Sequence, residues 1–328
     1  MKKHIVITTI NSPSEAVIKF SKLIDFKLTV VGDYKTPKDW NLDNVNFISF
    51  EQQQKLKYKI AKLLPKNHYS RKMIGYLEAI KQGAEFIVDT DDDNIPKQDW
   101  GFPDTIGEFE DVGENRGFIN IYQLFTDQKI WPRGLPLKLI GEKFFDNKQL
   151  TSVSSQIGVW QGLADEDPDV DAIYRLTSDE PCYFNDRKPV TLSTNTICPF
   201  NTQNTQIIKE LFPLLYLPCH VTFRFTDILK SLIAQPIMWK LGYKLGFTDA
   251  TVIQKRNPHD YMKDFISEIP MYEKSEYIIS MVDSVISPEK SIFENLRLSY
   301  EKLIDESIVP SKELDILDAW IGDLKKLG

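Results

Sequence analysis

Four aspartates crowd into five positions at the point where an apolar run ends. The stretch AEFIVDTDDDNIP (84–96) places Asp89, Asp91, Asp92 and Asp93 directly after the run EFIV. Carboxylates this close repel one another unless a positive charge lies among them. Hard divalent cations prefer carboxylate and phosphate oxygens and keep open positions for substrate phosphates. The stretch is therefore a solvated acidic turn, a calcium loop or the metal site of an enzyme.

Three templates for a functional acidic cluster can be compared with this stretch. An EF-hand loop needs glycine at its sixth position and glutamate at its twelfth, where this sequence has Asn94 and Trp100. A phosphatase-type Asp-x-Asp-x-Thr motif needs threonine or valine in place of the last aspartate. The short Asp-x-Asp of nucleotide-sugar transferases, which holds Mn²⁺ or Mg²⁺ against a diphosphate, fits the residues and the preceding strand. We interpret Asp91 and Asp93 as the metal ligands and expect Asp92 to bond the ribose of the donor.

Three basic residues are candidates for holding phosphates or sugars. Arg71 and Lys72 lie at the start of an amphipathic helix predicted for residues 70–82, where the helix dipole favours an anion. A solvated basic turn is the alternative. Arg133 lies in WPRGLPL (131–137), whose prolines and glycine predict a rigid loop. A guanidinium on such a loop suits a carboxylate, a phosphate or a sugar ring, and a structural loop with an exposed arginine is the alternative.

Two later stretches contain candidates for a general base. GLADEDPDVDAIYRL (162–176) has five acids in seven positions. It is either a solvated acidic loop or the source of a base or sugar-hydroxyl acceptor, with Asp165 and Asp167 as the candidates. Arg224 and Asp227, three residues apart in VTFRFTDILKS, form either an ordinary helical ion pair or a base with its orienting cation.

Two polar stretches could complete such a site. The clustered amides of FNTQNT (200–205) suit sugar hydroxyls, but they also suit turns and caps. His259, in the Pro-punctuated stretch QKRNPHDY (254–261), is a candidate third metal ligand. The chain has only four histidines, although a lone histidine is usually structural.

The first half of the chain alternates strand and helix signals, and these elements must position the candidate residues. A helix is predicted after Ser12 as N-cap with Glu15 closing a capping box, and Gly83 should stop the helix over 70–82. The order predicts an α/β fold with a doubly wound, mostly parallel sheet, whose ligands bind beyond the carboxyl ends of the strands. Four β-branched or apolar runs are typical of its buried strands: HIVITTI (4–10), KLTVVGD (27–33), VNFISF (45–50) and EFIVD (85–89).

The remainder of the chain is less regular. Residues 95–200 are rich in Pro, Gly and aromatics, which predicts walls or lids of a site rather than scaffold. Residues 206–246 are predicted to be helical. From about residue 287 charged amphipathic helices follow, and we interpret them as an appended segment that packs on the main domain, on a partner protein or on another copy of the chain.

Length and composition are those of a soluble globular protein. The chain has 328 residues, of which 42% are hydrophobic and 27% charged, and no run reaches the roughly 18–20 apolar residues of a membrane helix. Its net charge of −7 argues against nucleic acid as a partner. Three cysteines without zinc-like spacing favour free thiols in a reducing compartment, so we expect a cytoplasmic protein.

Several motifs in order resemble the STELLO-type glycosyltransferases, first known from plant Golgi proteins. They are SRKMIGYLEAIKQGAEFIVDTDDDN, WPRGLPL, FNTQNT, FRFTDIL and RNPHDYMKDFISEIP. The likeness runs from about residue 4 to 275, and we expect the segment after 287 to lie outside it. A fainter likeness to plant UDP-arabinopyranose mutases lies in Asp91–Asp93, RGLPL and GVWQGLADEDPD. The plant STELLO proteins carry an N-terminal membrane anchor that we do not find here, so their location is not carried over.

Both resemblances imply a GT-A-like fold, a nucleotide-sugar donor and Mn²⁺ or Mg²⁺ at Asp91 and Asp93. In the mutases, the loop that corresponds to RGLPL carries a functional arginine, which points to Arg133. We expect a GT-A-like catalytic domain over 1–280 and a helical segment over 281–328. The donor, most simply a UDP-sugar, should lie against Thr8, Thr9, Asn11, Asp33, Arg71, Lys72 and Asp92.

The predicted activity is transfer of the sugar to a carbohydrate or glycoconjugate acceptor. Asp227 is the favoured base and Asp165 its alternative, with His259 a third metal ligand. The rival hypotheses are a nucleotide-sugar mutase and a non-catalytic scaffold for a polysaccharide synthase.

Overall fold

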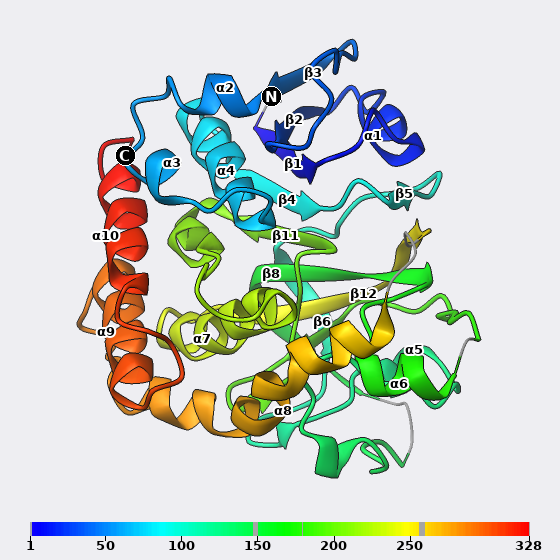
Figure 1. Ribbon diagram of the computed structural model, residues 1–328. Coiled ribbons are helices and arrows are strands. Elements are labelled where there is room, and N and C mark those ends of the chain that lie inside the picture. The colour runs from blue at the N-terminus through cyan, green and yellow to red at the C-terminus, as the bar shows by residue number, and fades with distance from the viewer. Residues whose placement is uncertain (1, 147–149, 179, 256–259, 328) are drawn as a thin grey trace.

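A ten-stranded sheet forms the centre of the computed structural model (Figure 1), which describes the chain except residues 1, 147–149, 179, 256–259 and 328. Within the described residues the strand order is β3-β2-β1-β4-β11-β8-β6-β9-β12-β5, and β12 also pairs with β8. The first four strands are parallel, as the sequence predicts, and their bounds are β1 (Lys3–Thr9), β2 (Phe26–Gly32), β3 (Val45–Ile48) and β4 (Phe86–Thr90).

Helices cover both faces of this parallel part. Along β1 the side chains alternate: Ile5 and Ile7 join the core under α1 (Glu15–Phe20), and Val6 joins the core under α4 (Lys72–Lys81). Helix α4 follows the 3₁₀ turn η1 (Tyr69–Arg71) and ends before Gly83, whose φ is +78°. The predicted cap of the first helix is wrong by two residues, because Ser14 rather than Ser12 accepts the Val17 amide. Two short helices, α2 (Phe50–Gln53) and α3 (Ile60–Leu63), connect β3 to α4.

The second half of the sheet is mixed. β11 (Asn204–Ile208) is antiparallel to both β4 and β8, whereas β12 (Lys244–Gln254) is parallel to β8. The expected α/β class is confirmed, and the arrangement is consistent with a GT-A-like fold. The other strands are β5 (Asn94–Pro96), β6 (Ile106–Asp111), β8 (Thr151–Glu166) and β9 (Val190–Leu192), with β7 (Gly117–Phe118) and β10 (Thr196–Ile197) forming a separate pair.

The irregular region predicted over 95–200 contains the 16-residue strand β8, which the sequence did not reveal. Two glycines interrupt its apolar pattern for a packing reason. A Cβ on Gly158 would lie 2.2 Å from Leu211 Cδ1, and one on Gly162 would lie 2.3 Å from Asn204 Nδ2. Short helices complete this region: α5 (Tyr122–Phe125), η2 (Leu137–Leu139) and α6 (Ala172–Thr177).

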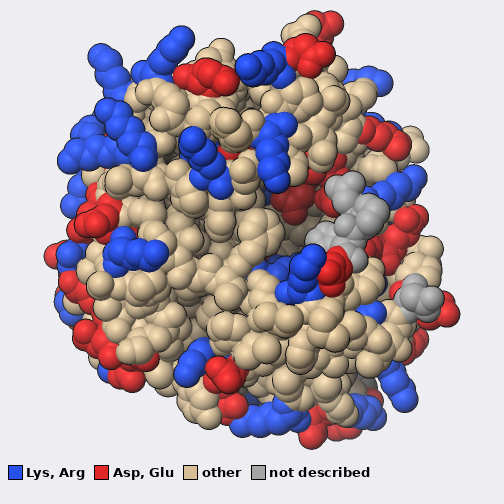
Figure 2. All heavy atoms as spheres, in the orientation of Figure 1, with Lys and Arg blue, Asp and Glu red and all other residues tan. Residues whose placement is uncertain are grey.

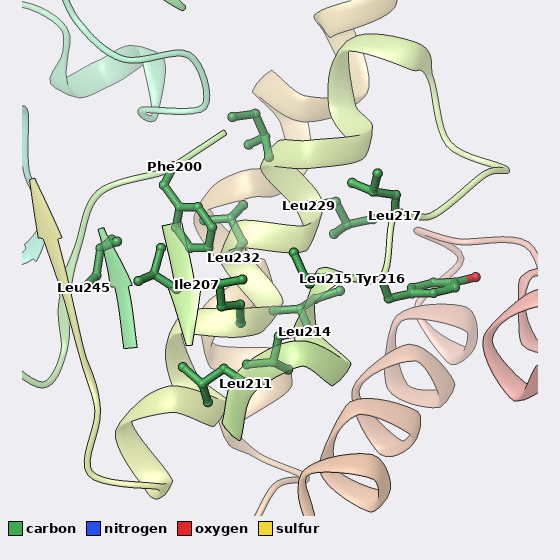
Figure 3. Close-up of a cluster of buried hydrophobic side chains, with 14 of the residues drawn as sticks. Phe200, Ile207, Leu211, Leu214, Leu215, Tyr216, Leu217, Leu229, Leu232 and Leu245 are labelled. Carbon is green, nitrogen blue, oxygen red and sulfur yellow. The ribbon is translucent and has the colours of Figure 1, made fainter. Parts of the chain in front are cut away.

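Helices of the C-terminal third pack on one another and on the sheet. The predicted helical region 206–246 is helical only in part, because it contains most of β11 and the start of β12 as well as α7 (Thr226–Lys240). Between β11 and α7 lie two 3₁₀ segments, η3 (Lys209–Leu215) and η4 (Phe223–Phe225). Figure 3 shows apolar side chains of β11, η3 and α7, such as Ile207, Leu211 and Leu232, gathered into one cluster.

The last three helices share the core of the rest of the chain. They are α8 (Tyr261–Asp283), α9 (Ile292–Asp305) and α10 (Glu313–Leu324). Buried residues of all three, among them Ile278, Leu303 and Trp320, belong to the same hydrophobic cluster as α4 and α7. Among the described residues, the structure contains no helix with the length and apolar character that crossing a membrane requires.

Candidate functional site

A pocket of about 430 Å³ opens at the carboxyl ends of β1, β2 and β4. In Figure 2 acidic side chains lie in a hollow just right of the centre of the face shown. Predicted donor, metal and base residues meet in this pocket although they come from distant parts of the chain. The predicted residues that line it are Thr8, Thr9, Asn11, Asp33, Asp91, Asp92, Asp93, Arg133 and Asp227.

Asp92 ties the acidic cluster to the end of β1. Its Oδ2 accepts hydrogen bonds from Thr9 Oγ1 and, at 3.1 Å, from Asn11 Nδ2, and its carbonyl oxygen accepts one from Ser14 Oγ. Ser14 is also the N-cap of α1. The Asp92 carboxylate therefore fixes one wall of the pocket, in addition to the ribose contact that the sequence predicts for it.

Asp33 arranges a second wall. Its two carboxylate oxygens accept the backbone amides of Tyr34 (2.6 Å) and His68 (2.9 Å). His68 and its neighbours Asn67 and Tyr69 line the pocket as a result. Burial lowers the pKa of His68 to about 4, so its ring is neutral at neutral pH.

Lys72 supplies the positive charge that the crowded aspartates need. Its Nζ lies 2.8 Å from Asp89 Oδ1, 2.8 Å from Asp91 Oδ1 and 2.9 Å from the Thr90 carbonyl oxygen, and the side chain is fully buried. Burial opposes the ammonium charge, but the two carboxylates together raise the pKa of Lys72 above its usual range. The prediction that Lys72 contacts the donor phosphates is wrong. Lys72 lies behind the aspartates and does not line the pocket.

The pair predicted to bind metal lies at the bottom of the pocket. Asp91 is the more accessible of the two carboxylates bonded to Lys72, with 38% of its side chain exposed. Desolvation raises the pKa of Asp91 to about 7, Lys72 opposes this shift and the neighbouring Asp93 adds to it. Gln254 Nε2 lies 3.3 Å from Asp93 Oδ2.

The donor set at Asp91 and Asp93 fits a hard divalent cation. Both side chains offer carboxylate oxygens, the ligand type that Mg²⁺ and Mn²⁺ prefer, and burial together with the neighbouring Asp93 raises the pKa of Asp91 although Lys72 opposes the shift. Among the described residues, no group of three or more His, Cys, Asp or Glu side chains could hold a metal ion. Water, carbonyl or substrate oxygens could complete the shell of such an ion. His259, the predicted third ligand, lies outside the described residues.

Arg133 lies opposite the acidic cluster and holds two carboxylates. Its guanidinium contacts Asp169 through Nε (2.8 Å) and Nη2 (2.7 Å), and Nη2 also contacts Asp227 Oδ2 at 2.8 Å. The two aspartates raise the pKa of the arginine against the effect of burial. The next residue, Gly134, has a φ of +91°, and a Cβ there would lie 2.5 Å from Ile228 Cγ2. Glycine thus lets the loop approach α7 closely enough for Arg133 to reach Asp227.

Two other predicted residues lie away from the pocket lining. Arg71 is buried, donates from Nε to Gln53 Oε1 (2.7 Å) and from Nη1 to the Leu64 carbonyl oxygen (3.0 Å), and stacks over Phe50. Its guanidinium therefore holds the 53–64 region instead of meeting a phosphate. Asp165 pairs with Lys97 at 2.7 Å and accepts the Phe184 amide, so β8 directs it away from the pocket.

Sequence reasoning missed several residues that line the pocket. Asp169 lies in the acidic stretch that the sequence singled out, but only the fold shows which of its five acids reaches Arg133. The sequence also predicts a role for the amide cluster 200–205, of which Asn201, Thr202 and Gln203 line the pocket. The lining residues that the sequence analysis did not single out are Lys35, Asn67, His68, Tyr69, Phe223 and Gln254, although Phe223 and Gln254 lie within stretches that it quotes.

Comparisons with known proteins agree with the motif-based resemblance. The family model of STELLO glycosyltransferases matches residues 224–328. Probable glycosyltransferase STELLO2 of Arabidopsis thaliana is 30% identical over 353 aligned residues, which cover 100% of this chain and 45% of that protein. Probable glycosyltransferase STELLO1 of the same plant is 27% identical over 347 residues, again covering 100% of this chain and 45% of that protein.

These matches correct one expectation and confirm another. The segment after residue 287, expected to lie outside the likeness, falls inside both the family match and the full-length matches. The chain spans less than half the length of these curated relatives. The predicted resemblance is confirmed: the whole of this chain is similar to part of the two STELLO proteins, and residues 224–328 match the family model of STELLO glycosyltransferases.

Proposed function

We propose that this protein is a metal-dependent glycosyltransferase that uses a nucleotide-diphosphate sugar, most simply a UDP-sugar. The single observation that carries the proposal is the pocket in which Asp91 and Asp93 at the end of β4 meet the ends of β1 and β2. Ligands of α/β sheets bind at this edge. The sequence relationship to proteins named probable glycosyltransferases supports the same reaction class.

The donor lies along the β1–β4 edge. Asp91 and Asp93 would hold Mn²⁺ or Mg²⁺, which when bound neutralises the negative charge that builds on the diphosphate leaving group. Thr8, Thr9 and Asn11 bind the nucleoside end through hydroxyl and amide groups. Lys72 keeps the Asp91 carboxylate oriented from behind, so that the acidic cluster is formed before the donor arrives.

The acceptor binds across the pocket, between Arg133 and the amides of residues 200–205. Asp227 is the favoured base for the acceptor hydroxyl, because it lines the pocket and Arg133 fixes its orientation. Asp169, held by the same guanidinium, is the alternative that replaces Asp165.

Calorimetry with UDP, with and without Mn²⁺, tests the donor site. We expect UDP binding that Mn²⁺ strengthens at least tenfold, and we expect Asp91→Asn and Asp93→Asn each to abolish that gain. Asp99→Asn, at an exposed aspartate a few residues along the chain, is the matched control and should bind like the parent. UDP affinity that is independent of Mn²⁺, or unaffected by both substitutions, would show that the metal assignment is wrong.

Incubation with UDP-sugars alone separates the rival activities. A transferase without acceptor gives slow hydrolysis to UDP and free sugar, whereas a mutase changes the ring form of the sugar with the UDP attached. A scaffold gives neither product and no binding. We expect hydrolysis, followed by NMR of the sugar anomeric protons, and ring isomerisation would replace our proposal with the mutase.

A further inference from the structure

The C-terminal helices reach the wall of the pocket through one buried carboxylate. Glu313, the first residue of α10, is fully buried. Its Oε1 accepts hydrogen bonds from the Cys219 amide (2.8 Å) and from Tyr216 Oη (2.5 Å), and its Oε2 accepts from the His220 amide (2.9 Å) and from His220 Nδ1 (2.7 Å). Both carboxylate oxygens are therefore fully used within residues 216–220.

Residues 216–220 lead directly into the pocket wall. Three residues beyond His220 the chain reaches Phe223, which lines the pocket together with Arg224 and Asp227. The Arg224 carbonyl oxygen accepts from Arg133 Nη1, so the loop held by Glu313 also helps to place the guanidinium that orients the proposed base.

A second carboxylate of the same helix holds a segment that leads to the adjoining wall, where Tyr69 Oη accepts the Asp227 amide at 3.1 Å. Asp323 is buried, and its Oδ2 accepts the amide of Ile60, the first residue of α3, at 3.0 Å. The chain from α3 continues through residues 64–67 to His68 and Tyr69 in the pocket. Between these two contacts, Trp320 Nε1 donates to the Pro213 carbonyl oxygen at 3.0 Å. α10 thus contacts two chain segments that lead to the pocket and meet there, where the Tyr69 and Phe223 rings are in edge contact.

We propose that α10 supports the active site from outside the pocket, and that Glu313 is a positioning residue for the acceptor wall at residues 220–227. The donor edge, which β1, β2 and β4 form, has its own hydrogen bonds through Asp92 and Lys72. Loss of Glu313 should therefore affect the two halves of the pocket differently. It should loosen the acceptor wall and leave the donor edge in place. The expected effect of Glu313 on turnover rests on the proposed glycosyl transfer. Its expected effect on the order of residues 216–225 does not.

Glu313→Gln tests the inference with two independent measurements. Each carboxylate oxygen accepts one backbone amide, from Cys219 or from His220. The NH₂ group of glutamine cannot accept from the amide that faces it, so at least one buried contact is lost. We expect hydrogen exchange of the backbone amides in 216–225 to accelerate at least tenfold, with α4 and β4 unchanged. We expect kcat for UDP-sugar hydrolysis to fall at least tenfold, while the Kd for UDP with Mn²⁺ stays within twofold of the parent value.

Asp318→Asn is the matched control. Asp318 lies on the same helix, is half exposed and forms a surface pair with Arg297. It should match the parent in exchange, turnover and UDP affinity. If Glu313→Gln behaved like this control in the exchange of 216–225, or lost UDP binding as severely as turnover, the proposal would be overturned.

Two further arms keep the test decisive. If Glu313→Gln does not fold, Tyr216→Phe removes only one of the four donors, and we expect roughly threefold faster exchange in 216–225; unchanged exchange would contradict the proposal. If the parent protein hydrolyses no UDP-sugar, the proposed function fails, but the exchange measurement still decides whether Glu313 holds the wall.

Discussion

Lys72 lies behind the aspartates of residues 89–93 and carries the charge that their crowding requires. Its ammonium touches both Asp89 and Asp91, and Tyr76 Oη donates to Asp89 at 2.6 Å. A buried ion pair of this kind is expensive to break from one side, because the remaining charges lose their partner in a low dielectric. The protein therefore has an acidic cluster that is stable before any metal binds, in which Asp89 is buried while Asp91, Asp92 and Asp93 stay partly exposed.

The raised pKa of Asp91 predicts how metal binding depends on pH. A carboxyl group with a pKa of about 7 is ionised at pH 8 and largely protonated at pH 6. A proton then competes with the metal for the same oxygens. We expect the Kd for Mn²⁺, measured by calorimetry, to rise on the order of tenfold per pH unit from pH 7 to pH 5. A Kd that changes less than twofold between pH 8 and pH 6 would contradict the assignment of Asp91 as a ligand.

At the scale of elements, close packing of α4 on the sheet keeps Lys72 in register with β4. Gly75 makes that contact possible, because a Cβ there would lie 2.5 Å from Val6 Cγ1 and 2.8 Å from Val31 Cγ2. Both valines belong to central strands that cannot move without shifting the pocket edge. Packing thus explains why a glycine lies in the middle of this helix, although glycine has a poor helix propensity.

Two glycine-to-alanine substitutions in helices should have opposite effects. Gly75→Ala overpacks the contact with β1 and β2, and we expect it to lower the free energy of unfolding by about 1–3 kcal/mol. Gly322→Ala in α10 adds a Cβ that meets nothing within 4 Å, so we expect a gain of about 0.5–1 kcal/mol. Urea denaturation followed by circular dichroism measures both. Equal effects in the two helices would show that helix propensity, not packing, dominates at Gly75.

Sequence patterns predicted the parallel half of the sheet well and the second half poorly. The runs 4–10, 27–33, 45–50 and 85–89 are continuous apolar blocks, and the structure has a strand in each. β8 escaped prediction because Gly158 and Gly162 break its pattern, and the reason for them lies in Leu211 and Asn204, far along the chain. The site was predicted in the same way where strands decide it: Asp33 and Asp91 each follow a strand of the parallel half, and both line the pocket. No local pattern distinguishes Asp169, or Arg71 as a structural arginine, because their partners come from other elements.

At the scale of the whole molecule, α9 and α10 share one core with α4 and α7. Trp320 is fully buried in that core, and its indole N–H is bonded to Pro213. The appended segment expected from the sequence is thus joined to the rest by both apolar contacts and buried hydrogen bonds. Such contacts favour cooperative unfolding of the described residues, although the boundary expected near residue 280 stays a prediction.

Trp320→Ala should therefore destabilise more than its own helix. We expect the free energy of unfolding to fall by about 3–5 kcal/mol, as for other buried tryptophans. Tryptophan fluorescence and far-UV circular dichroism should still report a single coincident transition in urea. An early transition confined to part of the helical signal would instead show that the C-terminal helices unfold as a separate unit.

The sequence separation of the Glu313 and Asp323 contacts sets an order for biosynthesis. Glu313 meets its loop 94 residues back along the chain, and Asp323 meets Ile60 263 residues back. A polypeptide emerging N-terminus first can form the β1–β4 edge early, since all four strands lie within residues 3–90. The contacts of Glu313 and Asp323 must wait until α10 has been synthesised, and residue 323 follows Ile60 by about 10 s or more at typical translation speeds. During that interval the nascent chain lacks the α10 contacts of both segments that lead to the pocket.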